Sequence, residues 1–498
     1  MSDPLATRVS KHLHDPSTGK RGERRRHAAF SKLAATALMA LCASSLSACG
    51  DDDDDGNTGG SGGTGGATGG TGGATGGTGG GSGGTGGSTG GSGGSGGSAG
   101  AAGAAGEGGA AGSAGAAGSA GEGGAAGTAG ASGSAGAAGA AGAAGASFDG
   151  QEIFRHDTFG DEQLWTDVLE MHEVIASGVS PNTALAVGLK VDADALPAGI
   201  LDTADLDEPA TTVALLELDA VVGLKGTVEG GELVAVGITC ALCHSDVDDS
   251  VMEGIGSRLD GYANRDLDPG AILALSPALQ SDEAQEVLTS WGPGRYDPRW
   301  NIDDINHPVL IPPIYGLDGV VLETYTGDGP ISYWNAYVGV TQMGGQGNFS
   351  DPRIGVSIEH DPDLLTPKLP ALLDYQLSIP APAPPAGTFD PEAAERGQAL
   401  FEGVAGCSTC HIGPTFTDAN LGRFHTAAEV GQEPLTAMRS ATGFYRTTPL
   451  RALWQHPPYF HDGSAETLLD VVDHYDALMA LELTDPEKAD LVEYLLSL

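Results

Sequence analysis

Four of the six cysteines lie in two copies of one five-residue pattern. Residues 240–244 read Cys-Ala-Leu-Cys-His, and residues 407–411 read Cys-Ser-Thr-Cys-His. Two thiols at this spacing can add to the two vinyl groups of one haem, and the histidine that follows is then placed to coordinate the iron. The pattern therefore predicts two covalently bound haem c groups. Their expected attachment and ligand residues are Cys240, Cys243, His244, Cys407, Cys410 and His411.

A single zinc ion bound by the four cysteines is the alternative interpretation. Zinc does not require a histidine directly after each Cys-x-x-Cys pair, whereas both pairs have one. Haem attachment accounts for the whole pattern, so we favour it over zinc. It also leaves none of these four cysteines for a structural disulfide.

The second motif lies between two segments with helix-start signals. Asp390 and Pro391 have the residue types of an N-cap and a first helical turn, and the helical pattern continues to Phe401. A second helix is expected over residues 484–498, which begin with the capping-box pattern Thr-Asp-Pro-Glu. Gly397, one turn before Phe401, would allow the two helices to cross closely, as they do in cytochrome c domains.

The N-terminal part has the pattern of an export signal. Arginines at residues 21–26 precede an apolar run, Leu33–Ala43, that is too short to span a bilayer. Residues 46–49 read Leu-Ser-Ala-Cys and resemble a bacterial lipobox, which predicts a signal peptide over residues 1–49 and a lipid anchor on Cys49. An ordinary signal peptide cut nearby is the alternative. We expect an exported lipoprotein, periplasmic or at the cell surface, and Gly50 favours the outer membrane.

Residues 50–147 are nearly all Gly, Ala, Ser and Thr, apart from an aspartate run at their start. Such a composition predicts a disordered, flexible tether. The net charge of −43 excludes nucleic acid as a partner, because nucleic-acid binding needs a basic patch. It suits instead a redox partner protein such as a small basic cytochrome or a cupredoxin, although a solvated surface is the simpler interpretation.

The C-terminal part resembles a known family. Residues 445–451 read Tyr-Arg-Thr-Thr-Pro-Leu-Arg, and residues 458–463 read Pro-Tyr-Phe-His-Asp-Gly. Together with the second haem motif, they resemble the C-terminal domain of bacterial di-haem cytochrome c peroxidases and their MauG-type relatives. The resemblance covers about Asp390–Leu498 and implies an α-helical domain that holds one haem on His411.

The resemblance also implies a distal ligand for this second haem. Family peroxidases have a Met fourteen residues beyond the His that corresponds to His461, whereas this chain and MauG-type proteins have a Tyr, here Tyr475. Tyr475 is therefore the expected iron ligand; its neighbour His474 and an ordinary packed tyrosine remain alternatives. His461 is expected near this haem or at the domain interface, with a catalytic role, or else in a hydrogen-bonded turn with Asp462.

The segment before the second domain contains a weaker repeat of the same pattern. Asp328-Gly329 matches Asp462-Gly463, which predicts two cytochrome domains in tandem, over residues 148–385 and 386–498. Family peroxidases place a Trp just before the first Asp-Gly pair, between the haems. Here Gly327 stands in that place, and the candidates for its role are Tyr325 and Trp334.

Family members also carry a Glu or Gln over the first haem. Gln346 is nearest to that position and is the expected catalytic amide, although an amide is a poor general base. Met343 is an alternative ligand to the iron, and His156 or His172 could close the distal side of this haem. Residues 164–175, which contain His172, have a helical pattern.

These features predict a mainly α protein with two tandem cytochrome c-like haem domains behind a Gly/Ala-rich tether. The resemblance implies an oxidoreductase that reduces peroxide or activates oxygen, with the reactive haem on His244. A non-enzymatic electron carrier and a rubber-oxygenase-like enzyme that cleaves a macromolecule are the alternatives. Calcium between the domains is usual in the peroxidases, so Ca²⁺ is a further candidate ligand.

Overall fold

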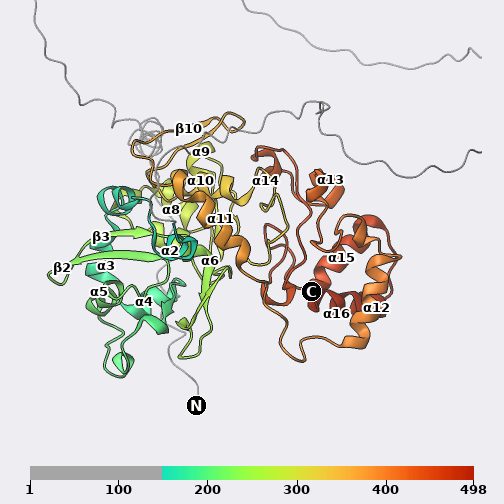
Figure 1. Cartoon of the computed structure of the whole chain (residues 1–498), viewed down its shortest axis with the longest axis horizontal. Helices are drawn as coiled ribbons and strands as arrows, with labels where there is room; N and C mark the ends of the chain where they lie inside the picture. Colours follow the sequence, from blue (N-terminus) through green and yellow to red (C-terminus); the bar gives the residue numbers. More distant parts are fainter. Residues whose placement is uncertain (1–147) are drawn as a thin grey trace, which may run out of the picture. The chain divides into compact units, whose positions relative to one another are not determined.

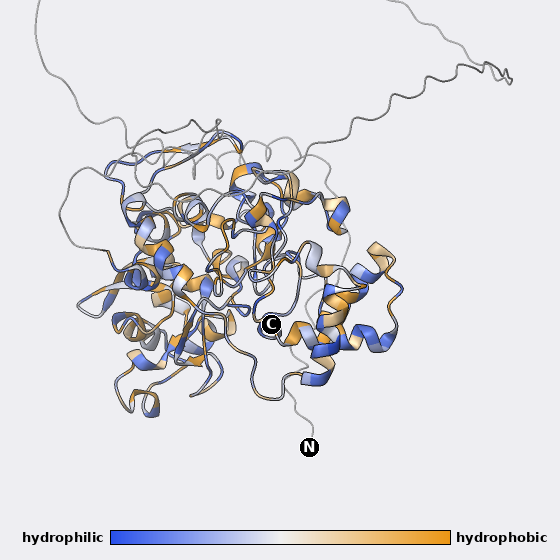
Figure 2. Cartoon of the chain, turned by 45° about the vertical axis from the view of Figure 1, so that its right-hand side comes forward, coloured by the Kyte–Doolittle hydropathy of each residue, from blue (hydrophilic) through white to orange (hydrophobic). Residues whose placement is uncertain are grey.

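Helix is the dominant secondary structure in residues 148–498, the part of the chain that the computed structural model describes (Figure 1). This agrees with the mainly α prediction. The predicted signal peptide, Cys49 and the Gly/Ala-rich tether lie outside the described residues. Within residues 148–498, no helix is both long enough and apolar enough to cross a membrane. In Figure 2 the visible helices carry both hydrophilic and hydrophobic residues.

Residues 148–385 contain short helices joined by small sheets. The helices are α2 (Gly150–His156), α3 (Met171–Gly178), α4 (Pro181–Ala186), α5 (Pro209–Glu217), α6 (Ala241–His244), α7 (Pro269–Leu273), α8 (Asp282–Leu288), α9 (Trp300–Asp303), α10 (Ile331–Thr341) and α11 (Leu369–Ser378). Every sheet here has two strands, so each serves as a local brace between loops.

Four of these sheets are antiparallel and one is parallel. The antiparallel pairs are β2 (Leu224–Glu229) with β3 (Glu232–Ile238), β4 (Ser245–Val247) with β6 (Arg258–Asp260), β7 (Arg295–Tyr296) with β8 (Val309–Leu310), and β9 (Phe349–Asp351) with β10 (Val356–Ile358). The parallel pair is β1 (Val191–Asp192) with β5 (Ile255–Gly256). The first haem motif follows the β2–β3 hairpin directly and forms α6.

A close backbone approach holds α6 in place. Gly223 has a left-handed φ of +79°, and a Cβ on it would overlap the backbone of Leu242 in the middle of the motif. Only glycine combines this backbone conformation with the absence of a side chain. Gly223 therefore lets the chain before β2 pack directly on the motif.

The helical pattern over residues 164–175 folds as two elements instead of one. A π-helix spans Gln163–Val168, and α3 begins at Met171. Between them Glu170 has a φ of +54°, a left-handed conformation that no helix interior tolerates for an L-residue. The break allows both Trp165 and Met171 to be buried, so packing overrides the helical period.

Residues 386–498 are more regular. The helices are α12 (Pro391–Glu402), α13 (Ala427–Val430), α14 (Leu435–Met438), α15 (Leu468–Met479) and α16 (Asp485–Leu496), and α12, α15 and α16 lie together near the C-terminus in Figure 1. The Asp390 carboxylate caps α12 by accepting from the backbone of Glu392 and Ala393. Thr484 and Glu487 form a capping box at the start of α16. The two helices expected from the sequence are thus confirmed.

The crossing of α12 and α16 depends on Gly397. A Cβ at this position would overlap the carbonyl oxygen of Asp490 and approach the Tyr494 side chain. Phe401 and Tyr494 then pack edge to face across the helices, with ring centroids 5.2 Å apart. The close crossing builds the small hydrophobic cluster that surrounds the second haem motif.

Candidate haem sites

The first motif presents its reactive side chains to a large cavity. Cys240, Cys243 and His244 line this cavity together with many apolar side chains. The imidazole Nδ1 of His244 lies 3.0 Å from the carbonyl oxygen of Pro312, to which it can only donate. This fixes the proton on Nδ1 and leaves Nε2 as the lone-pair nitrogen, the arrangement that axial histidines use.

The second motif repeats this arrangement with different partners. The Nδ1 atom of His411 lies 3.1 Å from the carbonyl oxygen of Phe416, so Nε2 again carries the free lone pair. Burial lowers the pKa of His411, and it lowers the pKa of His244 to about 4. Both imidazoles are therefore neutral at pH 7, as iron ligands must be.

The four thiols do not form one zinc site. Cys240 and Cys243 pack against the large hydrophobic cluster of residues 153–372, whereas Cys407 packs against the separate cluster around α12 and α16. Among the described residues, no potential metal cluster brings the two pairs together. Burial raises the pKa of Cys240 and Cys243 to about 12 and that of Cys407 to about 11.

Two arginines with buried guanidinium atoms, the half-buried Arg265 and the buried Arg446, fit a haem, whose propionates are anions. The Nε and Nη1 atoms of Arg265 and the Nη1 atom of Arg446 are buried without a hydrogen-bond partner in the described structure. Burial lowers the pKa of Arg446 to about 10, although the nearby Tyr325 and Glu323 act in the opposite direction. Both guanidinium groups lie close enough to Tyr325, which lines the cavity, to interact with its phenol. Orphaned buried donors are rare, so an anionic group in this region would satisfy them.

At the second motif, Tyr475 is better placed than His474 to face an iron. Tyr475 is half-buried, and its burial and the nearby Cys410 and Cys407 thiols raise its pKa to about 12. His474 instead uses Nε2 to contact the carbonyl oxygen of Val430 at 2.9 Å. The ligand role of Tyr475 stays a prediction, but the geometry favours it over its neighbour.

The expected amide over the first haem lies elsewhere. Gln346 does not line the cavity, and its Nε2 donates to the carbonyl oxygen of Gly160 at 3.3 Å. The chain leaves α10 through Gly344, whose φ is +81°, and this turn directs Gln346 away. Gln342 and Met343 line the cavity in its place.

Gln342 belongs to a short polar chain in the cavity wall. The Tyr296 hydroxyl donates to Gln342 Oε1 at 2.8 Å, and Gln342 Nε2 donates to Asn301 Oδ1 at 3.0 Å. Met343 is buried, and its carbonyl oxygen accepts from the Trp165 indole at 3.0 Å. His156 and His172 are not among the cavity-lining residues.

Glu323 is a cavity residue that the sequence did not reveal. It lines the cavity, and its carboxylate accepts from the backbone N–H of Ile331 at 2.7 Å. Burial raises the pKa of Glu323, despite this hydrogen bond. No local motif marks this residue, because its place depends on the loop that precedes α10.

Tyr325 and Trp334 both line the cavity, but they face different neighbours. The Tyr325 ring lies 6.4 Å from the His461 ring, centroid to centroid. Trp334 instead packs on Tyr337 at 5.1 Å and lies 5.9 Å below the Arg299 guanidinium. Of these two candidates, Tyr325 is therefore the one that reaches the C-terminal part of the chain.

His461 is buried and points at Glu433. Its Nε2 lies 2.9 Å from Glu433 Oε1 and 3.3 Å from the Tyr445 hydroxyl. The His461 imidazole thus contacts Glu433 and Tyr445, and not Asp462 as in the alternative prediction of a hydrogen-bonded turn. His461 instead joins a polar cluster that includes His307 from the other half of the chain.

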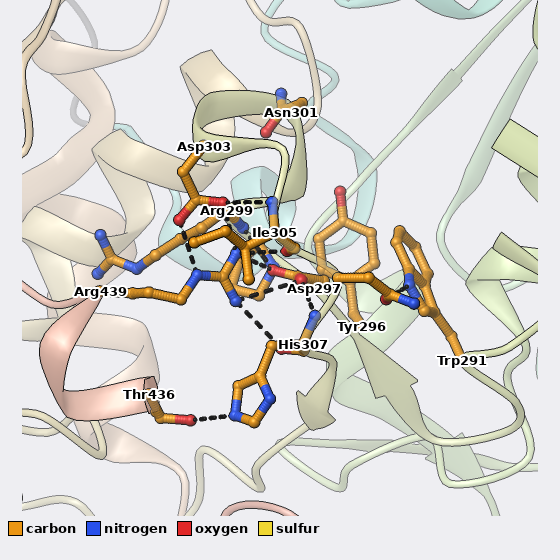
Figure 3. Close-up of polar contacts among 12 residues, drawn as sticks. Trp291, Tyr296, Asp297, Arg299, Asn301, Asp303, Ile305, His307, Thr436 and Arg439 are labelled. Atoms are coloured by element: carbon orange, nitrogen blue, oxygen red, sulfur yellow. Dashed lines mark hydrogen bonds and ion pairs between the residues drawn. The ribbon is translucent and has the colours of Figure 1, made fainter. Parts of the chain in front are cut away.

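An ion-pair network next to this cluster ties the two halves together (Figure 3). The Arg439 guanidinium donates to Asp297 Oδ1 at 2.9 Å and to Asp303 Oδ2 at 2.7 Å. The Asp297 carboxylate is fully buried, and its Oδ2 also accepts from the backbone N–H of His307 at 2.6 Å. No sequence pattern links Arg439 to these aspartates, which lie more than 130 residues earlier.

Comparisons with known proteins find curated relatives over part of the chain. No family model matches the chain. The chain is 34% identical over 120 residues to the methylamine utilization protein MauG of Methylorubrum extorquens, covering 20% of this chain and 33% of that protein. It is 29% identical over 143 residues to the cytochrome-c peroxidase IdrP2 of Pseudomonas sp. strain SCT, covering 21% of this chain and 39% of that protein. The chain thus spans about a third of the length of these curated relatives.

A comparison of structures adds a weaker likeness. A hydrazine synthase of Kuenenia stuttgartiensis matches with a TM-score of 0.26 and 22% sequence identity, over 38% of this chain and 72% of that one. A TM-score this low carries no argument about the fold.

Proposed function

We propose that the chain is a di-haem c-type oxidoreductase that reduces peroxide or activates oxygen. The premise is that it belongs to the superfamily of MauG and the di-haem cytochrome-c peroxidases. The observation that carries the proposal is the repeated geometry of the two motifs. In each, the histidine Nδ1 is held by a backbone carbonyl oxygen, and Nε2 is left free for an iron. Relatives named MauG and cytochrome-c peroxidase support the activity.

Two covalently bound haems would supply one-electron chemistry at iron, while the protein sets the ligands, the orientation and the polarity around them. The first haem would be held by Cys240, Cys243 and His244 in the large cavity. The second would be held by Cys407, Cys410 and His411. The separate hydrophobic clusters around the motifs support two tandem cytochrome domains over residues 148–385 and 386–498.

The cavity of the first motif has the groups that a peroxide or oxygen substrate requires. Glu323 has a raised pKa, so it retains its proton closer to neutral pH than an exposed glutamate and can exchange one with a substrate oxygen. Asn301 lines the cavity, and its Nδ2 donates one hydrogen to the Thr341 carbonyl oxygen at 2.8 Å, so its second N–H can orient a polar oxygen. Gln342 holds Asn301 in place through its Nε2. We therefore assign to Asn301 and Glu323 the roles that the sequence suggested for Gln346.

Electrons would pass between the two sites through the contact between Tyr325 and His461. Tyr475 would ligate the second iron, and its oxygen would stabilise the ferric state more than a methionine does. The redox partner is a basic protein such as a small cytochrome or a cupredoxin, because the chain carries a net charge of −43.

The location of the protein follows from the residues before 148. A signal peptide, a lipid on Cys49 and a flexible tether would place the haem-binding part away from an outer-membrane surface, in the periplasm or at the cell exterior. Haem c attachment is compatible with that location. Mass spectrometry of the mature N-terminus would test it, and a mature chain without lipidated Cys49 would contradict it.

The test of the activity is an electron paramagnetic resonance spectrum of the ferric protein before and after hydrogen peroxide. We expect a high-spin signal that disappears when peroxide is added. Two low-spin signals that peroxide and oxygen leave unchanged would overturn the enzyme proposal.

A second function is favoured by one observation. Met343 is buried and lines the first cavity, so its thioether could fill the sixth position of the first iron. The protein would then be an electron carrier with two six-coordinate haems. The Met343→Leu variant separates the two functions, because it would convert such a haem to high spin and would leave an already open haem unchanged.

A further inference from the structure

Three side chains from distant parts of the chain converge on one point beside the first cavity. His307 precedes β8, Glu433 precedes α14, and His461 belongs to the loop before α15. The Nε2 atoms of His307 and His461 each lie 2.9 Å from the same oxygen, Glu433 Oε1. All three ligand atoms lie within 4.8 Å of one another.

The Glu433 Oε1 atom has more neighbours than hydrogen bonding alone explains. Besides the two imidazoles, the backbone N–H of Thr436 lies 3.0 Å away and the Tyr445 hydroxyl lies 3.2 Å away. A carboxylate oxygen offers about two lone-pair directions, so four donors cannot all be served. Tyr445 has a better acceptor in the Glu433 carbonyl oxygen, at 2.6 Å, and His307 Nε2 also lies 2.9 Å from the Thr436 hydroxyl. His461 Nε2 has, besides Glu433 Oε1, only the Tyr445 hydroxyl at 3.3 Å.

An ion between the three atoms would resolve this crowding. We propose that His307, Glu433 and His461 bind one divalent transition-metal ion of the zinc type. In a tetrahedral site with bonds of about 2.0–2.1 Å, the ligand atoms would be roughly 3.3 Å apart, so the 2.9 Å contacts need to open by only about 0.4 Å. The Thr436 hydroxyl, 2.9 Å from His307 Nε2, or a water molecule would complete the coordination.

The donor set selects the kind of metal. Two imidazole nitrogens and one carboxylate oxygen suit zinc and its first-row neighbours, whereas calcium and magnesium require oxygen ligands almost exclusively. This site therefore differs from the calcium ion that the family resemblance implied. The second metal-like cluster in the described residues contains Cys410, which the haem motif uses, so we do not assign it to a metal.

The site is accessible to an ion from solution. The side chains of His307 and Glu433 are 22% and 27% exposed, whereas His461 is 3% exposed and closes the inner side. His307 and Thr436, which contact each other in Figure 3, also line the first cavity, so the ion would lie at its edge. Because His307 comes from one half of the chain and the other two ligands from the other, the ion would fasten the halves together.

The experiment measures zinc in the haem-loaded protein. The protein is stripped with a chelator, dialysed against Zn²⁺, and analysed for zinc and iron by mass spectrometry. Isothermal titration with Zn²⁺ gives the affinity. We expect about one tightly bound zinc for every two irons, and zinc X-ray absorption should show nitrogen ligands at the distance of imidazole.

Variants separate the proposed site from adventitious binding. His307→Gln keeps a group that can donate to Glu433 but removes the imidazole ligand, and Glu433→Gln removes the anion; both should lose the zinc. His360→Gln is the matched control, because His360 is a half-buried histidine whose Nδ1 contacts the Gly347 carbonyl oxygen outside the cluster. An unchanged Soret band in each variant shows that the fold and both haems are retained. Zinc that binds equally well to wild type and to both variants, or no zinc at all, would overturn the proposal.

Discussion

The first haem motif is held by segments that are far apart in the sequence, whereas the second is held mostly by its neighbours. The histidine of the first motif contacts Pro312, which is 68 residues away, and that of the second contacts Phe416, only five residues away. Around the second motif, α12 and α16 cross through a glycine that the sequence pattern itself indicates. A local arrangement is readable from sequence, and a non-local arrangement requires the tertiary fold.

The two sites also differ in their polar groups. The first cavity contains Glu323, Gln342 and Asn301 among its apolar residues, and it adjoins the Arg439 network. The second motif lies against a small, largely aliphatic and aromatic cluster near Cys407 and against the buried Asp418 and His425 near Cys410. We propose that the carboxyl and amide groups of the first cavity mark the haem that meets a substrate.

The largest expected effect comes from variants that remove one haem at a time. The double variant Cys240→Ser/Cys243→Ser should retain one covalent haem and lose peroxide reduction, because the reactive site is gone. The variant Cys407→Ser/Cys410→Ser should also retain one haem, but it should still bind peroxide at the first site. Pyridine haemochrome spectra count the haems. Equal peroxide responses from the two variants would contradict the division of roles.

Removal of Arg439 should destabilise the contact between the two halves. Arg439→Ala leaves the fully buried Asp297 carboxylate without its cation, which typically costs about 3–5 kcal/mol in the free energy of unfolding. Arg396→Ala is the control, because the Arg396 side chain in its ion pair with Asp490 is 59% exposed, so its removal should cost no more than about 1 kcal/mol. Denaturant titration followed by circular dichroism measures both, and comparable effects would refute the argument from burial.

Asp161, beside the first motif, should make stability depend on pH. Burial raises the pKa of Asp161 to about 9, although the hydrogen bonds that its carboxylate accepts from the Ile238 N–H lower it. Between about pH 4 and pH 9 the Asp161 carboxyl is protonated in the folded state and ionised in the unfolded chain. The free energy of unfolding therefore falls as the pH rises through this range, by at most about 1.4 kcal/mol per pH unit. Asp161→Asn should flatten the decline between pH 5 and pH 8.

The control for this titration is Asp202→Asn, a substitution at an exposed aspartate. It should leave the pH profile of the unfolding midpoint unchanged. If Asp161→Asn shows the same slope as wild type, the raised pKa does not contribute to stability.

The glycine crossing in the second half should be sensitive to a single methyl group. Gly397→Ala would place a Cβ against the Asp490 carbonyl oxygen and force α12 and α16 apart, at a cost of about 1–3 kcal/mol. Gly178→Ala is the control, because no atom lies within 4 Å of a Cβ at that helical position. Thermal unfolding compares the two, and a stable Gly397→Ala protein would show that the helices can separate without loss.

The smallest expected effect on stability comes from a substitution of Tyr475, the expected distal ligand of the second haem. Tyr475→Phe should leave the fold intact but raise the reduction potential of one haem, because the oxygen ligand to ferric iron is lost. His474→Ala should leave the potential unchanged, since its imidazole contacts the Val430 carbonyl oxygen. Potentiometric titration distinguishes them, and a shift only in His474→Ala would assign the ligand to the histidine.

The sequence by itself determined the features that depend on a few neighbouring residues. The Cys-x-x-Cys-His spacing, the Asp390 cap and the Thr484 capping box act within one turn of chain, so their residue types are sufficient. The Gly397 crossing was also predictable, because a cytochrome c domain brings this helix against the C-terminal one. A longer pattern was less reliable: residues 164–175 divide at Glu170 because burial of Trp165 and Met171 outweighs helical periodicity.

Only the tertiary structure decided which polar groups meet. Gln342 and not Gln346 faces the first cavity, because a left-handed glycine redirects the chain after α10. Arg439 pairs with Asp297 across 142 positions, and His307 meets Glu433 and His461 although it lies at least 126 positions before them. Such contacts are set by how hydrophobic clusters pack, and a single sequence has no short-range pattern that records them.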